Sequence, residues 1–119
     1  MKASKFKISN ESTNKLRFIQ AKTGLTPNIL LRIGFCLSLR DGSLILPEKF
    51  PQDGMELNRF TITGEYDCAF LSLLKEWQKI NKLPKDDRTS SDFFRAHLNR
   101  GALLLSGRIR SLIDLVYLE

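Results

Sequence analysis

The chain has 119 residues and a formal net charge of +6, and 42% of its residues are hydrophobic. These values are typical of one globular domain, and the length is too short for two domains with separate cores. No apolar run approaches the ~20 residues that a membrane-spanning helix needs, and the N-terminus lacks the apolar segment of a signal peptide. We therefore expect a cytoplasmic protein whose residues 1–119 form a single, compact, mainly helical domain.

The positive charge is concentrated near the N-terminus. Residues 1–40 contain eight basic side chains and one acidic side chain, a net charge of +7, whereas residues 41–119 have a net charge of −1. A localised positive field indicates a polyanionic partner, and nucleic acid is the first candidate. The alternative is a solvated basic face that only aids solubility.

The first forty residues have the pattern of a ribbon-helix-helix unit. Charged and apolar residues alternate over 5–8, which predicts a short strand. Ser9 or Asn10 can cap a following helix, and Gly24 can end it in the left-handed conformation. Thr26, followed by a proline, is the start signal of a second helix. Because a lone strand leaves its edges unpaired, we expect it to pair most simply with a strand from a second copy.

The two predicted helices of this unit differ in polarity. The first, which follows the cap at Ser9 or Asn10 and stops at Gly24, has a narrow apolar stripe, and the rest of its surface is polar and basic. The second, over residues 27–39, is apolar on nearly all sides, which is typical of a helix in a core or an oligomer interface. We therefore assign DNA contact to the arm, strand and first helix, and assembly to the second helix.

The residues of these two predicted surfaces follow from the charge and hydrophobicity patterns. Cations on an arm and a helix can neutralise phosphates, and lysines favour backbone contacts over base recognition. The predicted DNA contacts are Lys2, Lys5, Lys7, Lys15, Arg17 and Lys22. The predicted oligomer interface consists of Leu30, Ile33, Gly34 and Leu37.

The middle of the chain predicts irregular structure followed by one clear helix. Turn residues punctuate the segment 43–64, and the alternation over 58–63 favours a short strand there. Thr63 can cap a third helix, whose apolar residues keep helical spacing as far as Ile80. Pro84 lies just past its end.

The last region is predicted to be helical from about Asp92, with Ser90 or Ser91 as its cap. Gly107 can bend or break this region, and helical spacing resumes over 108–118. One bent helix and two short helices are equally consistent with the sequence.

The sequence shows no recognisable catalytic or metal-binding constellation. His97 is the only histidine, and its helical setting favours a structural hydrogen bond over catalysis. Cys36 and Cys68 lie among apolar residues, so we expect buried free thiols and neither a disulfide nor a zinc site. No phosphate-binding loop motif is present. We therefore expect no intrinsic enzymatic activity, no cofactor and no bound metal.

Three motifs follow one another along nearly the whole chain. They are KTGLTPNILLRI at 22–33, NRFT with GEYD at 58–67, and AHLNRG at 96–101. Together they resemble the family of the DNA sulfur modification protein DndE. The resemblance implies a small helical subunit of the bacterial DNA phosphorothioation system, in which sulfur replaces a non-bridging oxygen of the DNA backbone.

The same resemblance implies partners. It implies a homo-oligomer, a tetramer, that binds double-stranded DNA and favours nicked duplex. It also implies sibling proteins that perform the harder chemistry: a cysteine desulfurase, an iron–sulfur protein and an ATPase. No catalytic residue is carried over from the family.

Other functions remain open from the sequence. A ribbon-helix-helix transcriptional regulator is the main alternative, and it predicts tight binding to one palindromic operator instead of sequence-tolerant binding. An enzyme that nicks DNA and a scaffold that binds only proteins are further alternatives.

Overall fold

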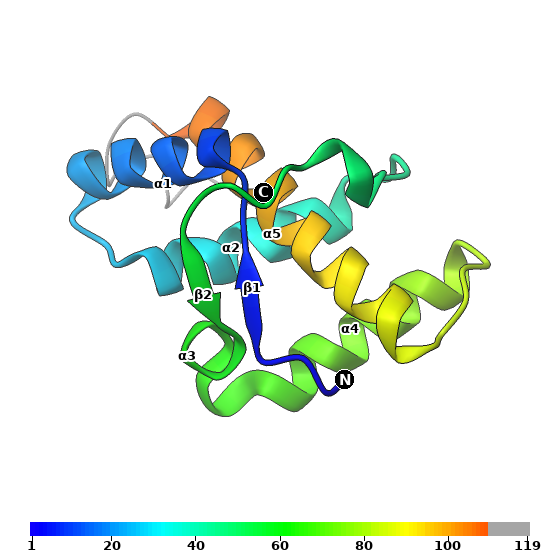
Figure 1. Cartoon of the computed structure of the whole chain (residues 1–119). Coiled ribbons are helices and arrows are strands. Elements are labelled where there is room, and N and C mark those ends of the chain that lie inside the picture. The colour runs from blue at the N-terminus through cyan, green and yellow to red at the C-terminus, as the bar shows by residue number, and fades with distance from the viewer. Residues whose placement is uncertain (110–119) are drawn as a thin grey trace.

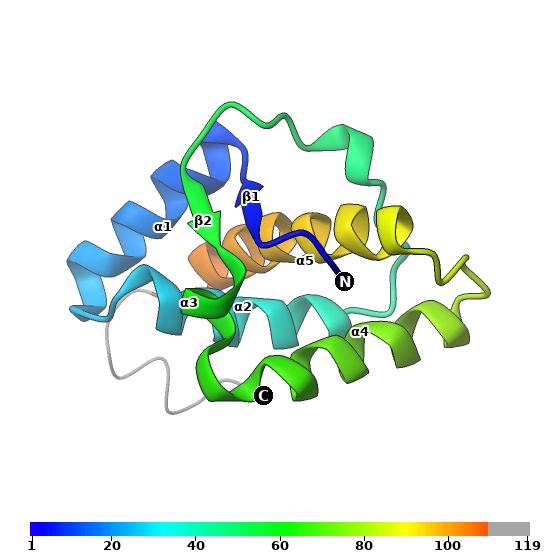
Figure 2. The ribbon, with the colours of Figure 1, turned by 60° about the horizontal axis from the view of Figure 1, so that its bottom comes forward.

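Helix α2 (Pro27–Arg40) runs through the middle of the molecule, and α1, α3, α4 and α5 all pack against it. A computed structural model describes residues 1–109 and shows a compact, mainly helical domain with one small sheet, as the sequence predicts (Figure 1). In Figure 2, α4 and α5 lie on either side of α2. The other elements are β1 (Lys5–Lys7), α1 (Asn10–Thr23), η1 (Pro47–Lys49), β2 (Glu56–Asn58), α3 (Arg59–Thr63), η2 (Gly64–Tyr66), α4 (Asp67–Ile80) and α5 (Asp87–Arg108).

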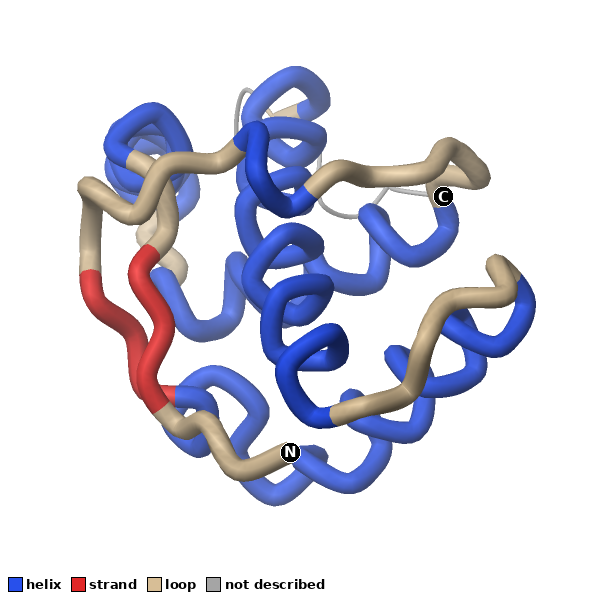
Figure 3. The backbone as a smooth tube through the Cα atoms, turned by 45° about the vertical axis from the view of Figure 1, so that its right-hand side comes forward, coloured by secondary structure: helices blue, strands red, loops and turns tan. Residues whose placement is uncertain are grey.

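Strand β1 is paired within its own chain. It runs antiparallel to β2, with Phe6 opposite Leu57 and Lys5 opposite Asn58. Figure 3 shows the two strands together at the edge of the helical body. The expectation that β1 pairs with a second copy is therefore wrong, because residues 56–58 of the same chain satisfy its edge. The order strand, helix, helix of the predicted N-terminal unit is confirmed.

The strand predicted over 58–63 is also wrong, because most of this segment is the short helix α3. The side-chain oxygen of Asn58 accepts hydrogen bonds from the backbone N–H groups of Phe60 and Thr61 at 2.9 and 3.3 Å. This cap turns the chain into a helix at the residue where the alternating pattern begins. Local capping thus overrides the β propensity of the following Thr and Ile residues.

Helix α1 has the boundaries that its capping residues predict. The hydroxyl of Ser9 accepts a hydrogen bond from the backbone N–H of Ser12 at 3.1 Å. Gly24 ends the helix with φ of 75°, in the left-handed region that glycine adopts without steric cost.

Helix α5 begins earlier than the sequence predicts. Its cap is Asp86, which accepts a hydrogen bond from the backbone N–H of Thr89, instead of Ser90 or Ser91. The helix then continues without interruption to Arg108, past Gly107. The segment over which helical spacing was expected to resume lies, from residue 110 onward, outside the described residues.

Helices α2 and α5 approach each other through two glycines. A Cβ atom added to Gly101 would lie 2.3 Å from both the carbonyl carbon and the carbonyl oxygen of Gly34. Because backbone meets backbone here, no side chain fits on either helix without separating the two. This contact fixes the distance between the two helices at the centre of the core.

The same contact corrects the prediction of an oligomer interface on α2. Leu30, Gly34 and Leu37 are buried in the core of their own subunit, and Ile33 is half-buried. The argument that α2 is too apolar for one subunit fails because four other helices of the chain cover it. The apolar residues on nearly all sides of this helix instead reflect its place at the centre of the subunit's own core, the alternative that the sequence pattern allowed.

Two arginines of α5 hold the long connection between α2 and β2 against the core. The guanidinium of Arg95 donates hydrogen bonds to the carbonyl oxygens of Phe50 and Pro47 at 2.8 and 3.1 Å. The guanidinium of Arg100 donates to the carbonyl oxygens of Ser38 and Ser43 at 2.6 and 2.8 Å. Three of these acceptors lie in the connection, which has little regular structure of its own, and the fourth, Ser38, lies in the last turn of α2.

None of the helices within residues 1–109 is long and apolar enough to cross a membrane.

Replacing Gly101 with alanine is expected to lower the free energy of unfolding by about 3 kcal/mol, because the new methyl group meets the backbone of α2. Gly107 on the same helix has nothing within 4 Å of an added Cβ atom, so Gly107→Ala is the matched control. Gly107→Ala should leave the free energy of unfolding unchanged or raise it by up to about 1 kcal/mol. Urea denaturation of both variants measures the difference, and equal stabilities would contradict the role of the glycine contact.

Candidate nucleic-acid interface

The outer face of the β1–β2 ribbon presents two of the five lysines that the sequence assigned to DNA contact. Lys5 and Lys7 are exposed, while Phe6 between them is buried and its ring lies 5.0 Å from that of Phe94. Alternation along the strand therefore holds the two ammonium groups on one face. Glu56 lies directly opposite Lys7 on β2, so its carboxylate offsets part of the positive charge at that end of the ribbon.

The cations of α1 are divided between two flanks of the helix. Lys15 and Lys22 are seven residues apart and share one flank, whereas Arg17 lies roughly 200° around the helix from Lys15. Arg17 is one turn after Thr13, whose hydroxyl accepts a hydrogen bond from the backbone N–H of Met55, just before β2. Arg17 therefore lies on the ribbon side of α1, and the two lysines lie on the opposite side.

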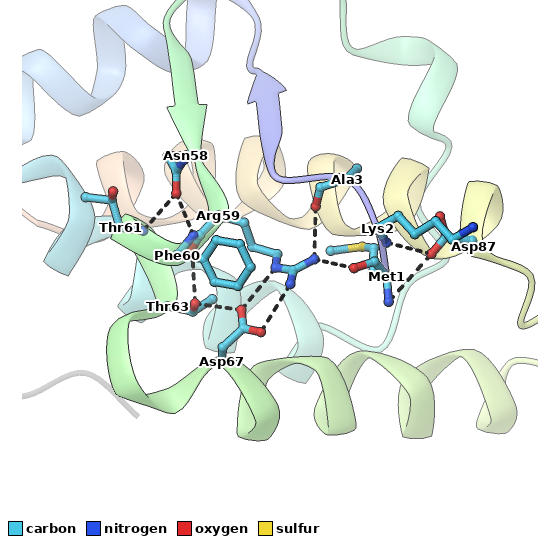
Figure 4. A network of polar contacts seen from close by, with 10 residues as sticks. All are labelled: Met1, Lys2, Ala3, Asn58, Arg59, Phe60, Thr61, Thr63, Asp67 and Asp87. Carbon is cyan, nitrogen blue, oxygen red and sulfur yellow. Dashed lines mark hydrogen bonds and ion pairs between the residues drawn. The ribbon is translucent and has the colours of Figure 1, made fainter.

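The N-terminal arm is docked on the domain instead of extending freely into solvent (Figure 4). Arg59 is buried, and its guanidinium donates to the carbonyl oxygens of Met1 and Ala3 at 2.6 and 2.9 Å. The ammonium group of Met1 lies 3.5 Å from Asp87, which also accepts a hydrogen bond from the backbone N–H of Lys2. Lys2 is exposed, but it sits beside a carboxylate and at the end of β1 remote from α1.

Sequence reasoning missed the buried ion pair that anchors this arm. The guanidinium of Arg59 contacts both carboxylate oxygens of Asp67 at 3.1 and 3.4 Å, and the hydroxyl of Thr63 donates to the same carboxylate at 2.7 Å. The ring of Phe60 covers the guanidinium at 4.3 Å. The sequence did contain a signal for this ion pair: the motifs NRFT and GEYD carry opposite charges, Arg59 and Asp67, eight residues apart.

All six predicted DNA contacts are exposed, but they form three groups instead of one continuous face. The ribbon lysines and Arg17 lie on one side of α1, Lys15 and Lys22 on the other, and Lys2 at the far end of the arm. The ribbon and α1 together therefore form the candidate interface, and Lys2 is peripheral to it.

His97 lies in the core and contributes nothing to this surface. Its side chain is fully buried, and its Nδ1 lies 2.7 Å from the hydroxyl oxygen of Ser38. The pKa of His97 is lowered to about 3, mainly by burial and to a smaller extent by the nearby positive charge of Arg100. The imidazole is therefore neutral at physiological pH, and it packs edge-to-face against Trp77 at 4.3 Å. A structural role for this histidine fits both contacts.

The two cysteines are exposed free thiols, which corrects the expectation that they are buried. Cys36 lies on the outer side of α2 and Cys68 in the first turn of α4, so an apolar neighbourhood in the sequence did not place them in the core. Partial burial raises the pKa of the Cys36 thiol, which disfavours the nucleophilic thiolate. Within residues 1–109, no group of three or more His, Cys, Asp or Glu side chains could hold a metal ion.

The family model described as DNA sulphur modification protein DndE matches residues 5–112. The chain belongs to the DndE family. The crystal structure of DndE from Escherichia coli B7A, involved in DNA phosphorothioation modification, is 26% identical in sequence, with a TM-score of 0.70. It covers 88% of this chain and 99% of its own.

A second DndE crystal structure shares the fold. This mutant, in which two glycines are replaced by lysine, is 23% identical, with a TM-score of 0.69 and coverage of 88% of this chain and 99% of its own. No curated protein matches the chain. The family and the fold that the motifs predicted are thus confirmed, and the chain is associated with DNA phosphorothioation.

Proposed function

We propose that this DndE family member is a cytoplasmic, non-catalytic DNA-binding subunit of the phosphorothioation machinery. It binds duplex DNA, with a preference for nicked duplex, through the ribbon and α1. The observation that carries the proposal is the exposure of Lys5, Lys7 and Arg17 on neighbouring elements of a family associated with DNA modification. These cations meet phosphates, so binding is sequence-tolerant and sensitive to salt.

The sulfur chemistry belongs, in this proposal, to partner proteins: a cysteine desulfurase, an iron–sulfur protein and an ATPase. The buried neutral state of His97 and the raised pKa of Cys36 support a subunit that presents DNA instead of reacting with it. The subunit would hold the duplex in place while a partner acts on the backbone.

A ribbon-helix-helix regulator is less well supported than it was from the sequence. In such regulators two copies form the ribbon that enters the major groove. Here β1 already pairs with β2 of its own chain, and Glu56 stands beside Lys7 on the outer face. That face therefore offers one lysine strand, not the symmetric pair that reads a palindrome.

Exchanging Lys5 and Lys7 for glutamate is expected to weaken duplex binding by at least tenfold at 0.1 M salt, because two phosphate contacts become repulsive. Fluorescence anisotropy over a salt series measures the affinity, and the salt slope should fall by about 2. The control exchanges Lys82 and Lys85 for glutamate in the α4–α5 connection and should change both quantities less. Equal losses in the two double variants would show a nonspecific charge effect instead of an interface.

In a host strain that lacks its own DndE, the wild-type gene should restore DNA phosphorothioate, and the Lys5→Glu, Lys7→Glu variant should not. Mass spectrometry of digested genomic DNA measures the modification. Unchanged modification after deletion of the gene would contradict the proposed role.

Relaxation of supercoiled plasmid by the purified protein with divalent metal would contradict the absence of catalysis.

We also propose that the subunit assembles into a homo-oligomer, a tetramer, in which α4 supplies a contact between copies. Tyr66, at the N-cap of α4, and Leu73 and Ile80 within the helix recur every seven residues and are 54%, 49% and 69% exposed. Two α4 helices packed antiparallel about Leu73 would bring Glu65 of one copy near Lys79 of the other. The apolar stripe and these opposite charges support self-association here, whereas most of the predicted α2 residues are already buried.

Leu73→Glu should reduce the molar mass in solution by separating copies, because it places like charges opposite each other at the centre of this contact. Light scattering after size exclusion measures the mass, with Leu44→Glu as control, since Leu44 is 58% exposed but lies outside α4. An unchanged mass for Leu73→Glu, or a wild-type monomer, would refute the α4 contact.

A further inference from the structure

A hollow lies between α1 and the C-terminal end of α5, on the flank of α1 that carries Lys15 and Lys22. It has a volume of about 490 Å³. Its lining residues are Glu11, Asn14, Lys15, Phe18 and Ser106. The volume is within the range of sites that hold small organic groups. The hollow thus joins an aromatic ring, a cation and hydrogen-bonding groups at the edge of the candidate DNA interface.

Phe18 is the aromatic side of this hollow and is 52% exposed. The Lys22 ammonium lies 5.5 Å from the centre of its ring. In proteins that hold unpaired nucleic acid, exposed rings stack on bases while neighbouring cations follow the phosphates. Lys15 and Lys22 lie three residues before and four residues after Phe18, so a cation stands on each side of the ring along the helix.

The polar groups of the hollow are suited to the edge of a base. The Asn14 amide can donate and accept hydrogen bonds. The Ser106 hydroxyl donates its proton to the carbonyl of Leu103 at 2.9 Å, which leaves its oxygen as an acceptor. Glu11 is the only acidic residue in the first forty, and its carboxylate would repel a phosphate but accept a hydrogen bond from an exocyclic amino group.

We propose that this hollow binds one unpaired nucleotide at an interruption in duplex DNA. Phe18 stacks on the base, Lys15 and Lys22 contact the flanking phosphates, and Glu11 accepts a hydrogen bond from the amino group of adenine, cytosine or guanine. Thymine has no such group and is disfavoured. The inference rests on the proposed DNA-binding function and extends it from the duplex backbone to a single base.

A base fits this site better than the apolar face of a second copy does. Glu11, Asn14 and Lys15 are exposed polar groups on the same side of α1 as Phe18, and an apolar partner would remove them from water without replacing their hydrogen bonds. A nucleotide offers a flat apolar ring, an amino group and a phosphate, which together match every group that lines the hollow.

The test compares three fluorescently labelled DNAs: an intact duplex, a nicked duplex, and a duplex with one unpaired adenine beside the nick. The measured quantity is the ratio of affinity for the third DNA to affinity for the intact duplex. Phe18→Ala should lower this ratio about tenfold, the effect of losing one aromatic–base stack. Phe60→Ala is the matched control, because Phe60 is also 52% exposed and also lies beside a cation, Arg59.

The affinity ratios of the two variants either support or overturn the nucleotide site. A ratio that falls in Phe18→Ala and not in Phe60→Ala supports the site. An unchanged ratio in Phe18→Ala, or an equal fall in both variants, overturns it while leaving duplex binding by the ribbon intact. A change in oligomeric mass without a change in the ratio assigns the hollow to a second copy and overturns it as well. Failure of the wild-type protein to bind any DNA overturns the proposed function too.

A second measurement tests the role of Glu11. Replacing the unpaired adenine with thymine should weaken wild-type binding about fivefold, and Glu11→Ala should abolish this difference between the bases. Fluorescence of 2-aminopurine at the unpaired position should be quenched by the wild-type protein, as stacking on Phe18 requires, and not by Phe18→Ala. Absence of quenching with the wild-type protein overturns the proposal.

Discussion

The backbone contact between Gly34 and Gly101 sets the geometry on which the rest of the molecule depends. It brings α2 and α5 so close that no methyl group fits between them. The buried residues of α2 are Leu30, Leu31, Gly34, Phe35, Leu37 and Ser38. The remaining elements cover α2 from other directions, so all of its large apolar side chains except that of Ile29 are buried or partly buried inside one subunit. An alanine at either position would separate the two helices and loosen the core that supports the ribbon and α1.

Three arginines, two of them buried and one partly buried, then attach the irregular parts of the chain to this helical frame. Arg95 and Arg100 of α5 hold the connection between α2 and β2, and Arg59 holds the N-terminal arm through carbonyl oxygens and Asp67. Each guanidinium presents several donors in a fixed plane, which suits it to backbone acceptors that no strand or helix satisfies. His97, Arg100 and Gly101 of the motif at 96–101 therefore make contacts that maintain the fold.

The surface proposed to bind DNA consists of exposed side chains on β1 and α1, outside the core. The cations of β1 and α1 are held at fixed positions by a strand with one buried face and by a well-capped helix. The two flanks of α1 therefore present different chemical groups. The ribbon side is suited to phosphates of an intact duplex, whereas the side that carries Phe18 also offers an aromatic ring and hydrogen-bonding groups.

The sequence by itself determined the mainly helical class, the family, the boundaries of α1 and the exposure of the six predicted DNA contacts. These features depend on local capping, on periodicity and on charge, which are properties of neighbouring residues. Only the tertiary structure decided that β1 pairs with β2, that 59–63 is helical, that α2 is buried within the subunit and that Cys36 is exposed. Strand pairing and burial depend on contacts between distant segments, and the same apolar pattern fits both a core and an interface until the covering helices are known.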